Sequence, residues 1–144
     1  MSDYFEQTSL SQHEAMAYSP LALAFLGDCV YEQCVRLRML REANMPVNEL
    51  NRKKVSYVCA DFQSAAVDII LPLLTEDELS VYKRGRNAKS GTVPKNATVS
   101  HYRRATGLEA LFGYLGLMSR QERINELFAV IYRGVPEGEE NEAN

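Results

Sequence analysis

The sequence predicts an all-α fold in a single domain, and three observations support that fold class. No segment shows the alternation of apolar and polar residues, bounded by turns, that is typical of a β-strand. The chain has only 8 Gly and 5 Pro in 144 residues, so long segments run without a helix breaker. Several of these segments begin with residues that cap helices. The 46% apolar content is also enough for a hydrophobic core and too high for a disordered chain.

The first two helices are predicted from proline positions and apolar spacing. Ser19 and Pro20 form a typical helix start, with serine as the cap and proline at the first helical position. This helix is expected to reach about residue 42. Pro46 can open a second helix to about residue 71, since apolar residues recur there at three- and four-residue steps. One face of the second helix is therefore expected to be apolar.

Three more helices are predicted from capping signals and loop composition. A capping box at residues 75–78 opens a helix that reaches about residue 87. A loop rich in Ser, Gly, Pro and Asn follows, and the next helix is expected over residues 99–117. A second capping box, at residues 119–122, opens a last helix that ends near residue 132. The predicted fold is therefore a bundle of five helices.

These elements divide the chain into a polar lead-in over residues 1–18, a helical domain over residues 19–134 and an acidic, flexible tail over residues 135–144. The N-terminus lacks the basic and apolar segments of a signal peptide. The longest apolar run begins at Leu21 and is interrupted at Asp28, so it is too short to cross a bilayer. We therefore expect no membrane partner.

The three cysteines, Cys29, Cys34 and Cys59, lie in apolar surroundings in the sequence. Their number is odd, none forms a C-x-x-C pair, and both histidines lie far from them along the chain, which disfavours a zinc site. We expect reduced, buried thiols in a cytoplasmic protein.

Two carboxylates, Asp28 and Glu109, stand inside otherwise apolar helical segments. Burying an ionised carboxylate without a partner is costly, so each must be paired, protonated or bound to a cation. One interpretation is that each finds its own arginine or a helix-end amide. The other is that two helices cross and bring both acids to one edge, where they bind a divalent cation. Magnesium would suit such a site, because it binds carboxylate oxygens and keeps most of its waters.

The charges of the chain are strongly segregated. The net charge is −3, yet residues 79–108 contain no Asp or Glu, and the nine basic residues outside this segment face all 19 acidic ones. The basic residues of the segment are Lys83, Arg84, Arg86, Lys89, Lys95, Arg103 and Arg104. A solvated surface patch is the plainer interpretation, but a phosphate-binding surface explains the missing acids better. Because aromatic residues suited to base stacking are missing, a duplex backbone is favoured over a single strand.

Other chemistries have little support in the sequence. Motifs such as G-x-S-x-G, the P-loop, G-x-G-x-x-G and H-E-x-x-H do not occur. His101 could act as a base, but a lone histidine near a basic segment is more often a phosphate contact or a structural residue.

Three motifs resemble those of ribonuclease III, and in particular those of the bacterial subfamily called Mini-ribonuclease III. The first is L-A-x-x-G-D at residues 23–28, and the second is the long R-G-R-N-A-K-S-G-T-x-P-K-N loop at residues 84–96. The third is Y-R-x-x-T-x-x-E-A at residues 102–110. The resemblance covers residues 20–128.

The resemblance implies a homodimeric, all-helical endoribonuclease without a separate RNA-binding domain. Such an enzyme cuts both strands of double-stranded RNA, leaves short 3′ overhangs and processes precursors of large-subunit ribosomal RNA. Asp28 and Glu109 are implied as the catalytic acids that bind Mg²⁺, and Phe25 as a dimer-interface residue. Where larger ribonucleases III carry further acids, this chain has Leu21, Ala24 and Thr106.

A set of basic and polar residues is expected to contact the RNA, from the basic segment and from the start of the second helix. These residues are Arg52, Lys53, Lys54, Lys83, Arg84, Arg86, Asn87, Lys89, Ser90, Lys95, Arg103 and Arg104. Two alternatives stay open: a non-catalytic protein of the same fold that binds double-stranded RNA, and a helical adaptor without a nucleic-acid ligand.

Overall fold

The computed structural model describes residues 9–89, 93 and 98–136, and these residues form helices and no β-strand. The all-α prediction is therefore confirmed. In chain order the elements are α2 (Gln12–Met16), α3 (Pro20–Glu42), α4 (Val47–Val58), α5 (Ala60–Ile70), the 3₁₀ turn η1 (Leu71–Leu73), α6 (Glu76–Asn87), α7 (Val99–Leu117) and α8 (Gln121–Gly134). No helix in the described ranges is long and apolar enough to cross a membrane.

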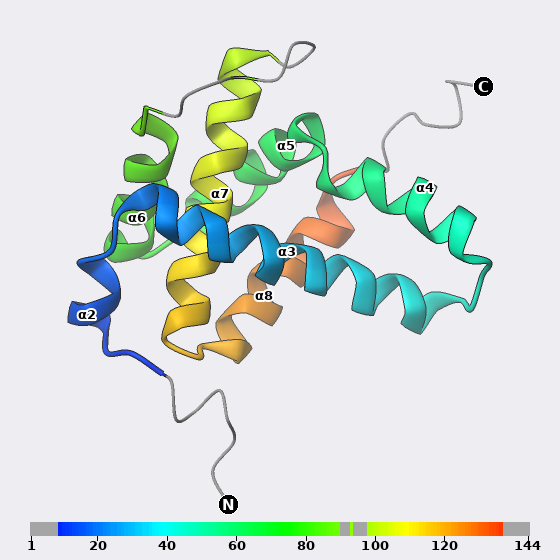
Figure 1. The fold of residues 1–144 in the computed structure, drawn as a ribbon, viewed down its shortest axis with the longest axis horizontal. Coiled ribbons are helices and arrows are strands. Elements are labelled where there is room, and N and C mark those ends of the chain that lie inside the picture. Colours follow the sequence, from blue (N-terminus) through cyan, green and yellow to red (C-terminus); the bar gives the residue numbers. More distant parts are fainter. Residues whose placement is uncertain (1–8, 90–92, 94–97, 137–144) are drawn as a thin grey trace, which may run out of the picture.

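The centre of the fold is α7, which packs against α3, α5, α6 and α8. Figure 1 shows α7, in yellow, running through the middle of the molecule, with α3 crossing it. Residues 110–115 of α7 are all buried, so this helix is apolar around most of its circumference. A helix of this kind is stable only when other helices cover it on several sides. The predicted bounds of α3 and α7 are confirmed.

The backbones of α3 and α7 touch where the two helices cross, and a glycine from each makes the contact possible. A Cβ atom on Gly27 would lie 1.5 Å from the carbonyl oxygen of Glu109, and one on Gly113 would lie 1.8 Å from that of Leu23. No side chain larger than hydrogen fits at either position without moving one helix away from the other. The two glycines therefore set the separation of the two core helices.

The predicted helix over residues 46–71 is divided, which corrects the expectation of one continuous element. Cys59 has an extended backbone, with φ −73° and ψ 158°, and separates α4 from α5. Its N–H donates to Val55 O at the end of α4, and its carbonyl accepts from Gln63 N at the start of α5. Because neither Gly nor Pro stands near the break, the sequence carries no signal for it. The break allows α5 to pack its apolar face against α7.

Two smaller expectations also need correction. Ser119 was predicted to cap the last helix, but α8 begins at Gln121 with Arg120 in the cap position and without a side-chain cap hydrogen bond. Among the cysteines, Cys29 and Cys59 are exposed and Cys34 is half-buried, although all three are free thiols as expected. Cys29 lies on α3, and Cys59 lies at the break between α4 and α5.

The lead-in contains more structure than its polar composition suggested. Within its described part, residues 9–18, the short helix α2 begins with a capping box between Ser11 and Glu14. Ala15 of this helix is fully buried, and Leu10 N donates to Leu117 O at the end of α7. This segment therefore covers one end of the helical core.

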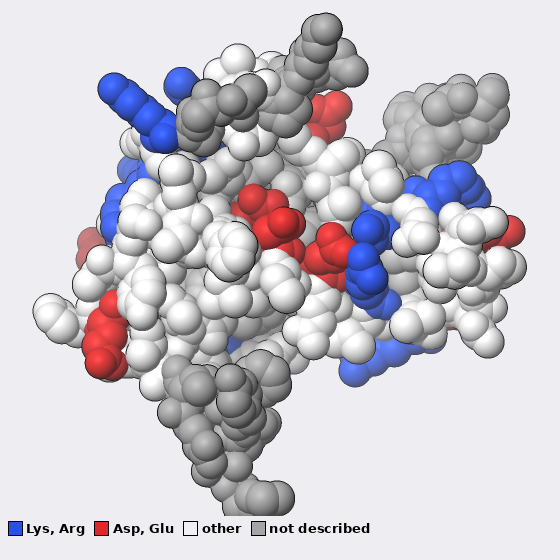
Figure 2. All heavy atoms as spheres, viewed as in Figure 1, with Lys and Arg blue, Asp and Glu red and all other residues white. Residues whose placement is uncertain are grey.

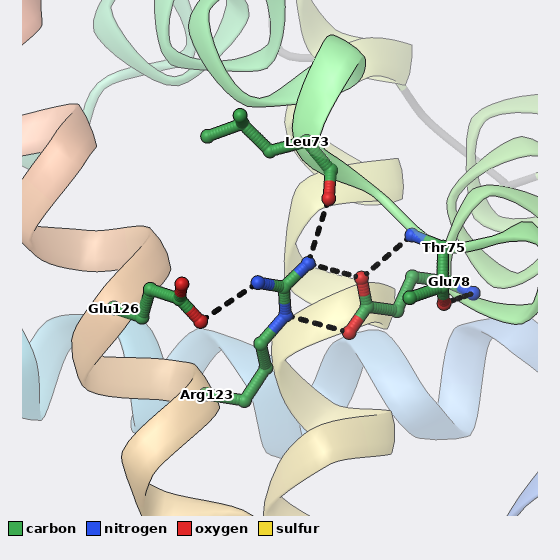
Figure 3. A network of polar contacts seen from close by, with 5 residues as sticks. All are labelled: Leu73, Thr75, Glu78, Arg123 and Glu126. Atoms are coloured by element: carbon green, nitrogen blue, oxygen red, sulfur yellow. Dashed lines mark hydrogen bonds and ion pairs between the residues drawn. The ribbon is translucent and has the colours of Figure 1, made fainter.

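One buried carboxylate, Glu78 at the start of α6, is fully satisfied inside the fold (Figure 3). Its oxygens accept hydrogen bonds from Arg123 Nε at 2.9 Å and Nη2 at 2.7 Å, and from the backbone N–H of Thr75 at 3.0 Å. Arg123 also donates to Leu73 O and Glu126. Burial raises the pKa of Glu78, but these hydrogen bonds outweigh it and hold the pKa below its usual range. The predicted capping box at Thr75 is confirmed as part of this network.

Replacing Gly113 with alanine should destabilise the protein by about 1–3 kcal/mol, because the added methyl group overlaps the backbone of α3. Gly116→Ala is the matched control on the same helix, since its Cβ would meet side-chain atoms rather than backbone, Val30 Cγ2 at 3.1 Å and Leu26 Cδ2 at 3.8 Å. Urea unfolding at a fixed protein concentration measures both changes. Equal effects of the two substitutions would contradict the proposed backbone contact.

Candidate active site

The structure brings Asp28 and Glu109 together at the crossing of α3 and α7. Asp28 follows Gly27, whose Cα packs against the backbone of Glu109, so the close approach of the helices also sets the spacing of the acids. Both side chains line one open pocket, whose wall also includes Phe25, Glu32 and Thr106. Asp28 is exposed and Glu109 is half-buried. The two acids therefore share a solvent-accessible site, although 81 positions separate them in the chain.

Glu109 is strongly perturbed by this environment. Burial and, next, the negative charge of Asp28 raise its pKa from 4.5 to about 7, although a hydrogen bond from Gln63 partly opposes the shift. A carboxyl group with this pKa holds its proton well into the physiological range, and a cation that binds to it would displace the proton to solvent. Such perturbed acids in clefts are typical of functional sites.

Neither acid has a basic partner among the described residues, whose ion pairs involve other carboxylates. Glu32, one turn after Asp28 on α3 and in the same pocket, differs from the two acids because it has basic partners. Its carboxylate accepts a hydrogen bond from Arg36 Nε at 2.7 Å and pairs with Lys54 at 3.4 Å. The interpretation that Asp28 and Glu109 are each neutralised by an arginine is therefore not supported.

Gln63 belongs to the site, although the sequence did not identify it as a site residue. It lies in the first turn of α5, is 2% exposed, and donates from Nε2 to Glu109 Oε2 at 3.4 Å. The one sequence signal is its position, because this polar residue stands on the apolar face of its helix, next to Phe62 and one turn before Val67. An isolated glutamine at such a position does not reveal its partner on another helix.

Two of the arginines predicted to contact RNA also hold the fold together. Arg84 donates to Met16 O at 3.1 Å and to Tyr18 O at 2.8 Å, which joins α6 to the segment after α2. Arg104 donates to both Oγ and the carbonyl of Ser64 at 2.9 Å, and it pairs with Asp68. Both guanidinium groups therefore contribute to positioning helices.

The other predicted RNA contacts within the described residues lie on α4, on α6 and just after it, and at the start of α7. Arg86 donates to Asn87 and lies over the ring of Tyr82. The exposed residues are Arg52, Lys83, Asn87, Lys89 and Arg103, and the half-buried ones are Lys53 and Lys54. Ser90 and Lys95 lie outside the described residues. Figure 2 shows acidic side chains near the middle of the face on which α3 lies, with Lys and Arg side chains on either side.

His101 does not lie beside the two acids. Its Nδ1 is 2.7 Å from Asp61 Oδ1, which connects the start of α7 to the start of α5. Eight residues of helix separate His101 from Glu109, or about 12 Å at the usual helical rise. The contact with Asp61 favours a structural role for His101 over a role as a catalytic base.

The donor set of the site suits one hard divalent cation. Asp28 and Glu109 provide two carboxylates without a counter-charge, which are the oxygen ligands that magnesium prefers. Across residues 9–89, 93 and 98–136, no cluster of three or more His, Cys, Asp or Glu side chains is arranged to hold a metal. Two protein ligands are nevertheless sufficient for magnesium, which keeps several of its waters.

Comparisons with known proteins agree with this arrangement. A family model described as the ribonuclease III domain matches residues 21–120, which include both acids. A crystal structure of a protein from Fusobacterium nucleatum has a TM-score of 0.74 at 34% sequence identity, over 82% of this chain and 94% of that one. Fold and domain together define an endoribonuclease of the ribonuclease III class.

Curated relatives narrow the assignment further. The "Mini-ribonuclease 3" of a Thermoanaerobacter species is 41% identical over 95% of this chain and 97% of its own length. The protein of the same name from Clostridium tetani is 38% identical over 99% of this chain and 95% of its own length. This chain belongs to the ribonuclease III family, in its Mini-ribonuclease 3 group.

The raised pKa of Glu109 predicts a dependence of stability on pH. Because the folded state holds the proton more tightly than the unfolded chain, this contribution is complete below pH 4.5 and is lost as the pH rises through about 7. Gln at this position does not titrate, so Glu109→Gln should gain stability relative to the natural chain as the pH rises. The expected gain is up to about 3 kcal/mol between pH 4.5 and 8.

Urea unfolding in the presence of a chelator, at one protein concentration, measures this difference. A gap between the two chains that stays constant from pH 4.5 to pH 8 would show that Glu109 has an ordinary pKa.

Proposed function

We propose that this endoribonuclease cleaves double-stranded RNA in a magnesium-dependent reaction and that Asp28 and Glu109 are its catalytic acids. The observation that carries the proposal is the meeting of these two acids, without a basic partner among the described residues, in an open pocket. A protein that uses a buried acid only for stability pairs it, as this chain does with Glu78. The unpaired arrangement favours a site built to receive a cation.

Asp28 and Glu109 would hold the magnesium ion between them. When bound, magnesium supplies a Lewis acid that activates water and offsets the charge growing on the phosphoryl oxygens and the leaving 3′ oxygen. The chain leaves most ligand positions to water and phosphate oxygens, because Leu21, Ala24 and Thr106 line the same pocket where larger relatives carry acids. We therefore expect these two acids to be indispensable, since the described residues contain no cluster of three or more His, Cys, Asp or Glu side chains that could hold the ion.

Basic side chains around the acids support a duplex RNA substrate. Arg52, Lys53 and Lys54 lie on α4, and Lys54 pairs at 3.4 Å with Glu32, which lines the same pocket as the acids. Lys83 and Arg86 lie on α6, which packs against α3 and α7. Contacts of this kind neutralise phosphates and read the shape of an A-form duplex with little sequence preference. Arg84 and Arg104 have the additional task of joining helices, so their loss would also reduce stability.

The natural substrate that we propose is a precursor of large-subunit ribosomal RNA in the cytoplasm. The support for it is membership in the Mini-ribonuclease 3 group, together with the matching motifs around Asp28, Arg84 and Glu109.

We further propose that the enzyme is a homodimer that uses the exposed side of α3. Phe25 is 84% exposed, an unusual state for a large aromatic side chain. Leu21, Leu37 and Leu40 are exposed on the same helix, and all four residues line the pocket that contains the acids. Covering this apolar row with a second copy would place two sites side by side, one for each strand of a duplex.

Replacing Asp28 with Asn should reduce cleavage of a long RNA duplex by at least about 100-fold, because the neutral amide is a poor magnesium ligand. Binding of the duplex should stay within about threefold, since phosphate contacts supply most of that affinity. Glu122→Gln, an exposed acid on α8, is the control and should cleave normally. Gel assays with magnesium or chelator measure cleavage, and fluorescence anisotropy measures binding.

Magnesium-dependent cleavage by the Asp28→Asn protein would remove Asp28 from the mechanism. A natural chain that binds the duplex and never cuts it would instead favour the non-catalytic alternative, and one that fails to bind at low salt would favour the adaptor.

Phe25→Asp should convert the dimer to monomers, because it places a charge in the centre of the proposed apolar interface. Leu73→Asp is the matched control, since Leu73 is also exposed but lies on η1 rather than α3. Sedimentation equilibrium gives the mass, which should be twice 16.3 kDa for the natural chain and the control. A monomeric natural chain would contradict the proposed dimer.

A further inference from the structure

We infer that Gln63 is a positioning residue that holds the Glu109 carboxylate in place for a divalent cation. The inference rests on the proposed function, in which Glu109 is a metal ligand. Gln63 itself lies behind Glu109, on α5, and is 2% exposed, so it has no direct access to a substrate in the pocket. Its part would be to fix the orientation of the acid.

The chemistry of the side chain supports this assignment. Burying an amide is costly unless it is hydrogen-bonded. The side-chain amide of Gln63 donates a hydrogen bond from Nε2 to Glu109 Oε2, at 3.4 Å. The –NH₂ group of glutamine is a donor and has no charge to lose. It can therefore support an ionised carboxylate without neutralising it, as an arginine would, and without repelling it, as a second carboxylate would. The amide therefore adds no charge of its own to the site that would receive a cation.

The backbone around Gln63 is firmly attached to α7. Oδ1 of Asp61, two residues before Gln63, accepts a hydrogen bond from Nδ1 of His101 at 2.7 Å. Ser64, the residue after Gln63, accepts two hydrogen bonds from Arg104, each at 2.9 Å. Contacts to α7 therefore flank Gln63 on both sides within the first turns of α5. A functional side chain is held accurately when its supporting residues are themselves fixed by packing and hydrogen bonds.

Fixing one oxygen of Glu109 has a direct consequence for cation binding. A free Glu side chain loses rotamer entropy when it binds an ion, and a hydrogen bond that already restricts the side chain reduces this loss. The bond to Gln63 uses one lone pair of Oε2, and the remaining lone pairs of the carboxylate stay available to a cation in the pocket that Asp28 shares. Residues that orient metal ligands in this way typically change metal affinity 10- to about 100-fold when they are removed.

The test is Gln63→Met, which removes the amide while nearly preserving length and volume. Calorimetric titration with Mn²⁺, without RNA, should show a dissociation constant about 10-fold or more above that of the natural chain. The Mg²⁺ concentration for half-maximal cleavage should rise by a similar factor, and saturating Mg²⁺ should restore most of kcat. Ser56→Ala is the control, because it removes a buried hydrogen bond on α4, to Lys53 O, and should leave the metal affinity unchanged.

An unchanged Mn²⁺ dissociation constant in a folded Gln63→Met protein would overturn the inference, even if its melting temperature falls. If the Gln63→Met protein does not fold, Gln63→Leu gives the same test with a branched apolar side chain. If the natural chain does not cleave RNA but the substitution still weakens Mn²⁺ binding, the proposed function fails and the role of Gln63 stands. The natural chain could instead cleave RNA while the substitution leaves both the Mn²⁺ dissociation constant and the Mg²⁺ concentration for half-maximal cleavage unchanged. In that case only the inference about Gln63 fails.

Discussion

The contact between the backbones of α3 and α7 sets both the packing of the core and the position of the two acids. Gly27 and Gly113 allow each helix to approach the carbonyl oxygens of the other, at positions where even a methyl group would overlap them. Because Asp28 follows one of these glycines and Glu109 provides the facing carbonyl, the contact that packs the core also brings the two acids together. Close packing and the candidate active site are therefore consequences of one crossing.

The fold treats two partly or fully buried carboxylates in opposite ways. Glu78 receives hydrogen bonds from Arg123 and Thr75 that lower its pKa despite burial (Figure 3). Glu109 has a second acid beside it and one neutral donor, so its pKa rises to about 7. The chain is thus able to satisfy a buried acid completely where stability requires it. The incomplete satisfaction of Glu109 is an energetic cost that a bound cation would remove, which explains why the arrangement is useful.

Local features of the chain could be predicted, and features that depend on long-range geometry could not. The Ser19–Pro20 start, the capping box at Thr75 and the two isolated acids each carry a signal within a few residues. The break at Cys59 carries none, because Cys59 adopts an extended backbone without Gly or Pro nearby, and α5 gains its position from packing on α7. Gln63 lies in the first turn of α5, directly after that break, and contacts Glu109 on α7. The sequence predicts only an RNA contact for Arg84 and Arg104. Their structural role could not be predicted, because composition does not reveal their hydrogen-bond partners on other parts of the chain.

In the proposed mechanism, Asp28 and Glu109 bind one divalent cation between them. Anomalous X-ray diffraction from crystals soaked in Mn²⁺, an ion that accepts the same oxygen ligands as magnesium, tests it most directly. We expect one strong anomalous peak per subunit within bonding distance of a carboxylate oxygen from each residue. A peak bound to only one of the two acids, or manganese bound elsewhere while this pocket stays empty at saturating concentration, would contradict it.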